Sequence, residues 1–421
     1  MKNGNQQHIV IIGGGFAGLS VAKQLKKSPF RVTIIDKSNH HLFQPLLYQV
    51  ATAALSPGDI AAPIRAILGK RSTARVLLGE VTNINFKEHT LALKDGRIID
   101  FDKLVLAPGA KYNYFGNNDW ENFAPGLKTI GDALKIRERI LLSLEEAEQR
   151  EDPILRKPFL TYVIIGGGPT GVEMAGAIAE IAKRSMRYNF QNLREEEIRI
   201  FLIEATGSIL NGFPEPLGDK GKKMLENLGV KVLMNSPVTG IEKNKVLLKE
   251  ETIETTNIIW AAGIKAPALF VDLPVEKDRL GRIFVNPDLS IPNYPDIFVL
   301  GDAAHYKDPD GNPLPALASV ASQQGEFLGK ILLEEGSKKS TTPVFKYVDK
   351  GQMATVGRAK AVADIKGFKF SGFFAWFLWS AVHILLLIGF RNRLRVFIEW
   401  MWNYFTFKRG VQLITDRADC K

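Results

Sequence analysis

The feature that most constrains this 421-residue chain is a glycine-rich turn that occurs twice. Each copy has an apolar stretch, a Gly-x-Gly-x-x-Gly turn and a run of small residues, at 8–19 and at 162–172. This spacing lets the backbone approach a pyrophosphate at a helix N-terminus and packs the helix closely on its strand. The turn glycines are Gly13, Gly15 and Gly18 in the first copy and Gly166, Gly168 and Gly171 in the second. The duplication predicts an α/β fold with two dinucleotide sites.

An acidic residue ends the strand that follows each turn. Asp36 stands 23 residues beyond Gly13, and Glu204 stands 38 residues beyond Gly166. Such a carboxylate can hold the hydroxyls of a ribose. The longer second interval predicts a longer helix and loop through 188–197. No Lys or Arg closely follows Glu204, so the second site favours NADH over NADPH.

The composition limits the other function classes. A hydrophobic content of 45% and a charged content of 24% are typical of a folded protein, and the length predicts two or three domains. The single cysteine, Cys420, excludes an intramolecular disulfide, and the six histidines show no metal-ligand spacing, so no metal is expected. The net charge of +10 comes without a recognised nucleic-acid motif. Residues 1–7 are polar and do not resemble a secretory signal, which predicts nucleotide sites that face the cytoplasm.

The order of strand patterns predicts nested domains. Strand patterns at 103–110 and 257–264 each enter a Pro-Gly or Ala-Gly pair, and a third at 295–305 ends in Gly301-Asp302. Between 129 and 152 apolar residues recur at helical spacing; they are Ala133, Ile136, Ile140, Leu144 and Ala147. The predicted divisions are a first nucleotide domain at 1–128, the second at 129–275, the remainder of the first at 276–345 and a C-terminal region at 346–421.

The C-terminal region has the pattern of a membrane-associated helix pair. Residues 373–390 carry no formal charge over 18 positions, about 27 Å of helix, which is marginal for a span. The next stretch places Leu394, Phe397, Ile398, Met401, Trp402 and Phe405 on one helical face. Five basic residues lie nearby with one acid, Glu399; they are Arg391, Arg393, Arg395, Lys408 and Arg409. We expect a peripheral helix pair on an anionic phospholipid surface. A helix pair buried against the body or in a dimer, and a single span, remain alternatives.

The stretch 40–60, both glycine turns, Gly301-Asp302 and 371–414 together resemble the type II NADH:quinone oxidoreductases. The resemblance implies two Rossmann-like domains, for FAD and for NADH, plus a C-terminal amphipathic membrane region. It also implies non-covalent FAD, NADH and a membrane quinone as substrates, a homodimer, and attachment to the cytoplasmic membrane face. Because Gly301-Asp302 resembles the pair beside FAD in two-dinucleotide flavoproteins, the first turn is assigned to FAD and the second to NADH.

The resemblance also implies the residues of each site. The expected FAD residues are Gly13, Gly15, Phe16, Ala17, Gly18, Asp36, Lys37, Val81, Ala107, Pro108, Gly109, Gly301, Asp302 and Ala318. The expected NADH residues are Gly166, Gly168, Pro169, Thr170, Gly171, Glu173, Glu204, Ala262 and Gly263. Glu173 and Gln323 are the expected catalytic residues, although an acid at the start of a helix also stabilises the helix.

One departure from the family bears on the acceptor. The family carries Ala-Gln-x-Ala-x-Gln with both glutamines toward the quinone, whereas residues 318–323 here keep only the second, and Ser319 replaces the first. Serine has no amide donor. The tentative quinone residues are Ser319, Gln323 and Gln324, with the headgroup held through water, by Gln324, or differently.

Two other function classes share parts of this pattern. Disulfide reductases and sulfide:quinone oxidoreductases depend on paired cysteines, which one cysteine cannot supply. An NADH-reducible flavoprotein with a non-quinone acceptor, or a redox sensor, is the remaining alternative.

Overall fold

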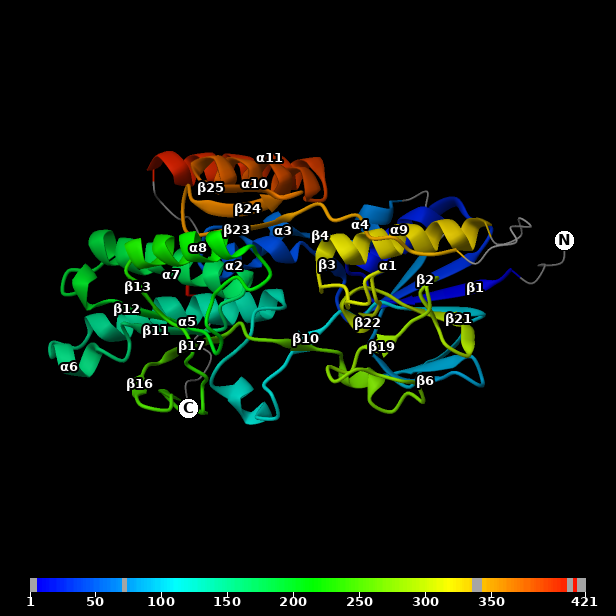
Figure 1. Ribbon diagram of the computed structural model, residues 1–421, viewed down its shortest axis with the longest axis horizontal. Coiled ribbons are helices and arrows are strands. Elements are labelled where there is room, and N and C mark those ends of the chain that lie inside the picture. The colour runs from blue at the N-terminus through cyan, green and yellow to red at the C-terminus, as the bar shows by residue number, and fades with distance from the viewer. Residues whose placement is uncertain (1–5, 70–73, 335–342, 407–411, 415–421) are drawn as a thin grey trace. The chain divides into compact units, whose positions relative to one another are not determined.

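The chain forms two compact units in the computed structural model (Figure 1). The structure describes residues 6–69, 74–334, 343–406 and 412–414, and within these all side chains except those of 184–188. The first unit combines Met1–Leu42, Ala61–Lys111 and Ile264–Asp349. The second combines Phe43–Ile60, Tyr112–Gly263 and Lys350–Lys421. The units thus change at 111, 263 and 349, whereas the predicted domain boundaries lie at 128, 275 and 345, and the second unit also includes 43–60.

The first unit is built on a six-stranded sheet in the order β20-β21-β9-β1-β2-β5. The strands are β1 (His8–Ile12), β2 (Arg31–Asp36), β5 (Arg75–Leu78), β9 (Lys103–Leu106), β20 (Ser290–Ile291) and β21 (Tyr294–Val299). All pairs are parallel except β20 with β21. Strand β1 is fully buried, as expected for a central parallel strand that is covered on both faces.

Helix α1 (Phe16–Gln24) follows β1 and packs against α9 (Ala318–Glu334). The two backbones lie close, because a Cβ on Gly325 would stand 2.3 Å from the carbonyl oxygen of Ala17. A small antiparallel sheet of β6 (Val81–Asn85), β7 (Thr90–Leu93) and β8 (Ile98–Asp100) adds to the core of this unit.

The second unit has a four-stranded parallel sheet in the order β13-β12-β11-β17. The strands are β11 (Thr161–Ile165), β12 (Arg199–Ile203), β13 (Val230–Leu233) and β17 (Asn257–Trp260). Its main helices are α5 (Ile130–Glu148), α7 (Pro169–Asn189) and α8 (Glu215–Asn227). A hairpin sheet of β14 (Gly240–Glu242), β15 (Lys245–Leu247) and β16 (Thr252–Glu254) precedes β17.

The doubly wound α/β architecture and the helix expected between 129 and 152 are confirmed. Helix α5 begins with a reciprocal cap, in which Thr129 Oγ1 accepts from the Asp132 amide and the Asp132 carboxylate accepts from the Thr129 amide. All five apolar residues of the predicted face are buried.

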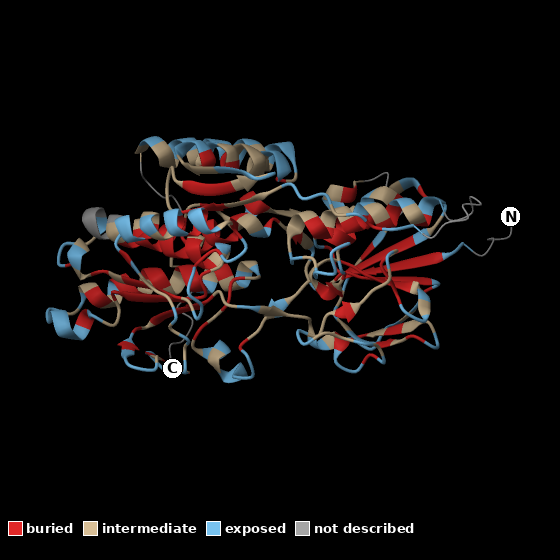
Figure 2. Ribbon diagram, viewed as in Figure 1, coloured by how far each residue is buried: buried red, intermediate tan, exposed pale blue. Residues whose placement is uncertain are grey.

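The C-terminal region belongs to the second unit. An antiparallel sheet of β23 (Gln352–Thr355), β24 (Ala361–Ile365) and β25 (Phe368–Gly372) leads into α10 (Phe373–Leu386) and α11 (Phe390–Thr406). Ala375 of α10 packs on Ala361 and Ala363 of β24. Figure 2 shows exposed residues along these two helices and buried strands in both main sheets. Among the described residues, no helix combines the length and apolar character needed to cross a bilayer.

Shorter elements complete the described chain. The segment 43–60 contributes α2 (Leu47–Ala51) and α3 (Pro57–Ile60) to the second unit. The others are β3 (His40–Leu42), β4 (Ala61–Pro63), α4 (Ile64–Leu68), β10 (Lys111–Tyr112), α6 (Pro153–Arg156), β18 (Ile264–Lys265), β19 (Ile283–Phe284) and β22 (Ala304–His305). Six 3-10 turns are η1 (Leu25–Lys27), η2 (Gln44–Leu46), η3 (Asn118–Asn122), η4 (Glu195–Glu197), η5 (Ala268–Phe270) and η6 (Gly301–Ala303).

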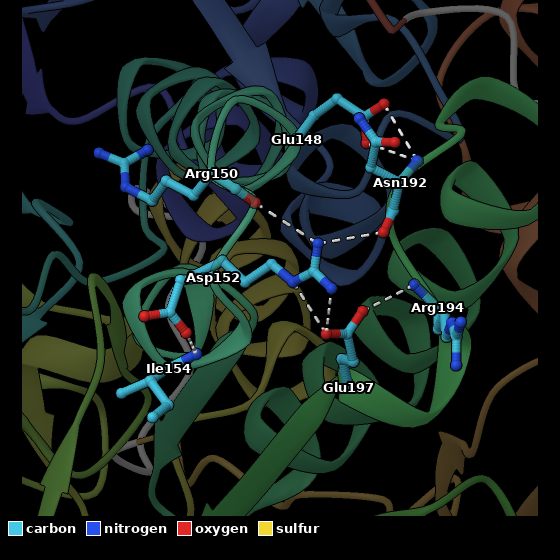
Figure 3. A network of polar contacts seen from close by, with 8 residues as sticks. Glu148, Arg150, Asp152, Ile154, Asn192, Arg194 and Glu197 are labelled. Atoms are coloured by element: carbon cyan, nitrogen blue, oxygen red, sulfur yellow. Dashed lines mark hydrogen bonds and ion pairs between the residues drawn. The ribbon is translucent and has the colours of Figure 1, made fainter.

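A polar network fixes the long connection between α7 and β12 (Figure 3). The buried guanidinium group of Arg156 donates to the Glu197 carboxylate at 2.8 Å and to the Asn192 carbonyl at 3.1 Å. The Glu148 carboxylate accepts from the amides of Gln191 and Asn192. The extra residues between Gly166 and Glu204 therefore form a 21-residue helix and a bonded loop.

We predict that Arg156→Met lowers the free energy of unfolding by about 3 kcal/mol, because it leaves a mostly buried carboxylate without its cation. Urea unfolding of the full chain measures this loss. Arg194→Met, which changes an exposed arginine of the same connection, is the matched control and should have little effect. Equal losses in the two variants would contradict the assignment.

Candidate functional site

The three glycines of the first turn have different structural roles. Gly13 has a φ of +100°, and a Cβ there would stand 2.1 Å from the Ala107 carbonyl oxygen. A Cβ on Gly18 would stand 1.9 Å from the Gly13 carbonyl oxygen. Gly15 is exposed and has no atom within 4 Å of its Cβ position. Gly13 and Gly18 are thus required by the fold itself, and Gly15 leaves open space for a ligand at the start of α1.

The second turn repeats this division. Gly166 has a φ of +111°, and its Cβ would stand 2.7 Å from the Ala262 amide nitrogen. A Cβ on Gly171 would stand 1.8 Å from the Gly166 carbonyl oxygen, whereas Gly168 has nothing within 4 Å. The open position lies at the start of α7, where unpaired amides favour a phosphate.

The two predicted acids occupy equivalent positions. Asp36 accepts from the Gly14 amide at 2.6 Å and from the Ser38 amide at 2.6 Å. Glu204 accepts from the Gly167 amide at 2.6 Å and from the Thr206 amide at 2.9 Å. Each carboxylate therefore bridges the second of the three consecutive glycines of its turn, Gly14 or Gly167, and the residue two positions beyond itself. Its remaining lone pairs are available for ribose hydroxyls.

The Gly301-Asp302 pair forms a turn directly after β21. Gly301 has a φ of +67°, and its amide donates to Oε1 of Gln324 at 2.6 Å. Asp302 lies on the wall of a cavity of about 280 Å³, together with Ile264, Lys265, Leu280, Arg282 and Ala316. An acid in a cavity with two cations suits a ligand that carries both hydroxyls and phosphates.

The other expected FAD residues lie in the first unit as follows. Phe16 and Ala17 begin α1, Ala107, Pro108 and Gly109 follow β9, and Ala318 begins α9. Lys37 is exposed beside Asp36, and Val81 packs on the hydrophobic core of the unit. Of the expected NADH residues, Pro169 and Thr170 begin α7, and Ala262 and Gly263 follow β17.

A buried histidine of the first unit was not singled out. The His41 ring donates from Nδ1 to the Gly14 carbonyl at 3.1 Å and packs edge-on against Phe16 at 4.9 Å between ring centres. Burial lowers the pKa of His41 to about 4, so the ring is neutral. His41 thus stabilises the first glycine turn through its hydrogen bond to Gly14 and its ring contact with Phe16.

Glu173 lies in the second turn of α7 on the wall of a cavity of about 660 Å³. Burial raises the pKa of its carboxyl group to about 8, and a hydrogen bond with the Thr355 backbone opposes this shift. Glu173 is therefore mostly protonated at neutral pH. Sequence reasoning found the acid but missed the cavity, whose wall also includes Tyr48, Gln49, Thr355, Arg358, Trp376 and Trp400.

The three polar residues of α9 have separate partners. Ser319 Oγ and the Tyr347 hydroxyl are hydrogen-bonded at 3.0 Å. The Gln323 amide donates to the Val348 carbonyl and accepts from the Val348 amide, both at 3.0 Å. Gln324 is buried, and its Oε1 accepts from the Gly301 amide.

Within the described ranges, no group of three or more His, Cys, Asp or Glu side chains is close enough to hold a metal ion. Cys420, Lys408 and Arg409 lie outside the described residues.

Comparison with known proteins extends over nearly the whole chain. A family model described as pyridine nucleotide-disulphide oxidoreductase matches residues 7–325, and a model of the NDH2 C-terminal domain matches residues 350–409. The type II NADH:quinone oxidoreductase Ndh of Mycobacterium tuberculosis is 39% identical, over 98% of this chain and 91% of the relative. NdhA of the same organism is 38% identical, over 98% and 90%.

Solved structures share the fold. NDH2 from Plasmodium falciparum in complex with NADH has a TM-score of 0.89 at 22% identity and covers 98% of this chain and 100% of that one. The sulfide:quinone oxidoreductase of Aquifex aeolicus has a TM-score of 0.73 at 18% identity, with 95% of each chain covered.

We predict that Gly15→Ala leaves the folded protein intact but weakens FAD binding about tenfold or more, since the added methyl group enters the space kept open for the ligand. The φ of −72° at Gly15 suits alanine. Equilibrium binding of FAD to the stripped protein, with its thermal midpoint, separates the two effects. Gly18→Ala should lower the thermal midpoint even without FAD, and a Gly15→Ala variant that binds FAD normally would refute the assignment.

Proposed function

Because this chain belongs to the family of type II NADH:quinone oxidoreductases, we propose that it oxidises NADH and reduces a membrane quinone by two electrons without pumping protons. The observation that carries the proposal is the pair of equivalent open turns, at Gly15 and Gly168, each with its own bridging carboxylate. Two such turns suit a cofactor and a second nucleotide on one chain.

FAD supplies the redox chemistry when it is bound, since it takes a hydride from NADH and passes two electrons to the quinone. The residues of the first unit fit this cofactor. Gly15 leaves its backbone open, Asp36 stands at the end of β2 for ribose hydroxyls, and Asp302 lies in the neighbouring cavity. We propose that these residues hold FAD non-covalently.

The second turn is the proposed NADH site. Thr206 donates to the Glu204 carboxylate through both its amide and its hydroxyl, which supports a fixed orientation of this acid. A 2′-phosphate at this position would face a carboxylate without a neighbouring cation in 205–207. This arrangement supports a preference for NADH over NADPH.

Glu173 is the proposed proton donor. Reduction of a quinone to a quinol consumes two electrons and two protons, so the site needs a group that is protonated at neutral pH. A carboxyl group with a pKa of about 8 meets this need, and a normal glutamate does not. Gln323 and Ser319 remain proposed acceptor-site residues, and both would act with the segment that contains Tyr347 and Val348.

The proposed membrane surface is the outer face of α11. Six large apolar residues of this face are each at least 40% exposed; they are Leu394, Phe397, Ile398, Met401, Trp402 and Phe405. Nearby Arg391 and Arg395 are also exposed and would meet anionic phospholipid headgroups. We propose peripheral attachment at the cytoplasmic face and, from the family resemblance, a homodimer.

An anaerobic titration tests the proposed function. We expect NADH to bleach the flavin absorbance of the purified holoenzyme and a short-chain quinone to restore it stoichiometrically, with buffer in place of quinone as the control. Bleaching without recovery would exclude the quinone acceptor and support a sensor or a different acceptor. Without bleaching by NADH, the NADH site itself would be excluded.

A double substitution tests the membrane surface. We predict that Phe397→Glu with Trp402→Glu reduces co-sedimentation with phosphatidylglycerol vesicles about tenfold or more, because two charges would enter the interface. Ile154→Glu changes an apolar residue of the same unit that is more exposed than Phe397 and Trp402, and this variant should bind vesicles normally. Unchanged binding of the double variant would exclude this face.

A further inference from the structure

A chain of buried hydrogen bonds connects α11 to the sheet beside Glu173. Trp400 Nε1 donates to Gln49 Oε1 at 2.8 Å, and Gln49 Nε2 lies 3.0 Å from the Tyr48 hydroxyl. The Tyr48 hydroxyl in turn lies 2.8 Å from Thr355 Oγ1. Tyr48, Gln49 and Thr355 are each less than 10% exposed. Residues from α11, α2 and β23 thus share one polar chain within the second unit.

The donors in this chain follow from its first member. An indole N–H can only donate, so the Gln49 carbonyl oxygen must face Trp400 and the Gln49 amide must face Tyr48. The Tyr48 oxygen accepts from that amide, and the Tyr48 and Thr355 hydroxyls share a further hydrogen bond in which either oxygen can donate. The direction of the first two bonds is thus fixed, and the third bond connects Tyr48 to Thr355.

The Thr355 backbone continues the connection to Glu173. Strand β23 is an edge strand, and Val356 N–H donates to the Lys360 carbonyl across the hairpin. At the neighbouring Thr355 the backbone polar groups therefore face away from β24. The Thr355 backbone hydrogen-bonds the Glu173 carboxyl group instead.

Close backbone contact fixes the spacing between β23 and α7. A Cβ on Gly176 would stand 2.6 Å from the Gly357 amide nitrogen, so the turn after β23 rests directly on the helix that carries Glu173. This contact places Thr355, two residues before Gly357, beside the helix that carries Glu173.

Helix α11 has two different faces. Val396 is fully buried, and Asn403 Nδ2 lies 3.4 Å from the Ala54 carbonyl on the same inner side as Trp400. The outer side carries the exposed residues that we propose to meet lipid. The position of Trp400 thus depends on the inner contacts of α11 and on the lipid that we propose to cover its outer face.

We propose that Trp400, Gln49 and Tyr48 are positioning residues that hold Thr355 against Glu173 and so connect the membrane helix α11 to the proton donor. This inference rests on the proposed function, in which Glu173 supplies a proton during quinone reduction.

Other charged groups around Glu173 come from several elements. Those on the cavity wall are Glu180 and Lys183 of α7, Glu195 of η4 and Arg358 of the turn after β23. From α10, His383 is neutral because burial lowers its pKa to about 4, and Tyr48 stays protonated because burial raises its pKa. The substitutions below change none of these charges.

The test uses vesicle-bound, full-length holoenzyme and the pH dependence of quinone-driven flavin recovery. In the wild type, recovery should slow as pH rises through about 8, the pKa of Glu173, and Glu173→Gln should remove this midpoint. Gln49→Leu breaks both links of Gln49, and Trp400→Phe removes the indole donor. Since the Thr355 hydrogen bond favours the ionised carboxylate, loosening it should move the midpoint upward by about 1 pH unit.

Two variants keep the test interpretable. Tyr48→Phe loses only one hydroxyl group, so it should fold and still move the midpoint upward. Gln352→Leu makes the same change as Gln49→Leu on β23 itself, where the side chain donates to the Gly212 carbonyl, and it should leave the midpoint in place. Thermal midpoint and FAD content identify any variant that is simply misfolded.

The outcomes distinguish a failure of the proposed function from a failure of the positioning role. If wild-type flavin does not recover with quinone, the proposed function fails. If it recovers and Glu173→Gln removes the midpoint, but Tyr48→Phe and Gln49→Leu titrate like the wild type, the positioning role is overturned. A midpoint that persists in Glu173→Gln would also overturn it, because another group would then be titrating.

Discussion

The rest of the structure depends on the bond between a strand-end carboxylate and the middle amide of a glycine turn. Asp36 makes this bond to Gly14, and Glu204 makes it to Gly167. A charged acceptor makes such a bond stronger than one between neutral groups. The bond ties the end of the second strand to the turn that follows the first, so the direction of the next helix is set. The amides at the start of the helix then lie beside the glycine whose Cβ position has no neighbouring atom, Gly15 or Gly168.

Helix α7 extends from the second glycine turn to the C-terminal sheet. It begins directly after its turn, at Pro169, presents Glu173 in its second turn, and meets the β23–β24 turn at Gly176. One helix therefore contributes to the proposed NADH site, carries an acid with a raised pKa, and supports the C-terminal sheet. Its position in all three roles follows from a single glycine turn, because a helix is stiff over this length.

Much of this organisation was predictable from local patterns. Glycine spacing, apolar strands and a terminal acid belong to segments of about 30 residues, so they predicted both nucleotide folds and α5. The sequence pattern pairs Asp36 and Glu204 as the acids at the two strand ends although their intervals differ by 15 residues, and both make the same hydrogen bond to a turn glycine. The longer interval is accounted for by α7 and by the loop that Arg156 holds.

What could not be predicted depends on contacts between distant segments. Tyr48 and Thr355 are 307 positions apart, and Gln49 and Trp400 are 351 apart. No periodicity relates such residues. Gln323 and Gln324 illustrate the same limit at short range: adjacent glutamines differ in burial because α9 turns one toward the Gly301 turn and the other toward Val348.

The two faces of α11 show why polar contacts matter inside an aromatic region. Trp376, Trp379, Trp400 and Tyr404 form ring contacts between α10 and α11. Apolar packing of this kind tolerates rotation and sliding, because dispersion contacts have little directional preference. The indole bond to Gln49 and the amide of Asn403 at Ala54 do have direction. They specify which face of α11 points inward, and thereby which six apolar residues remain exposed.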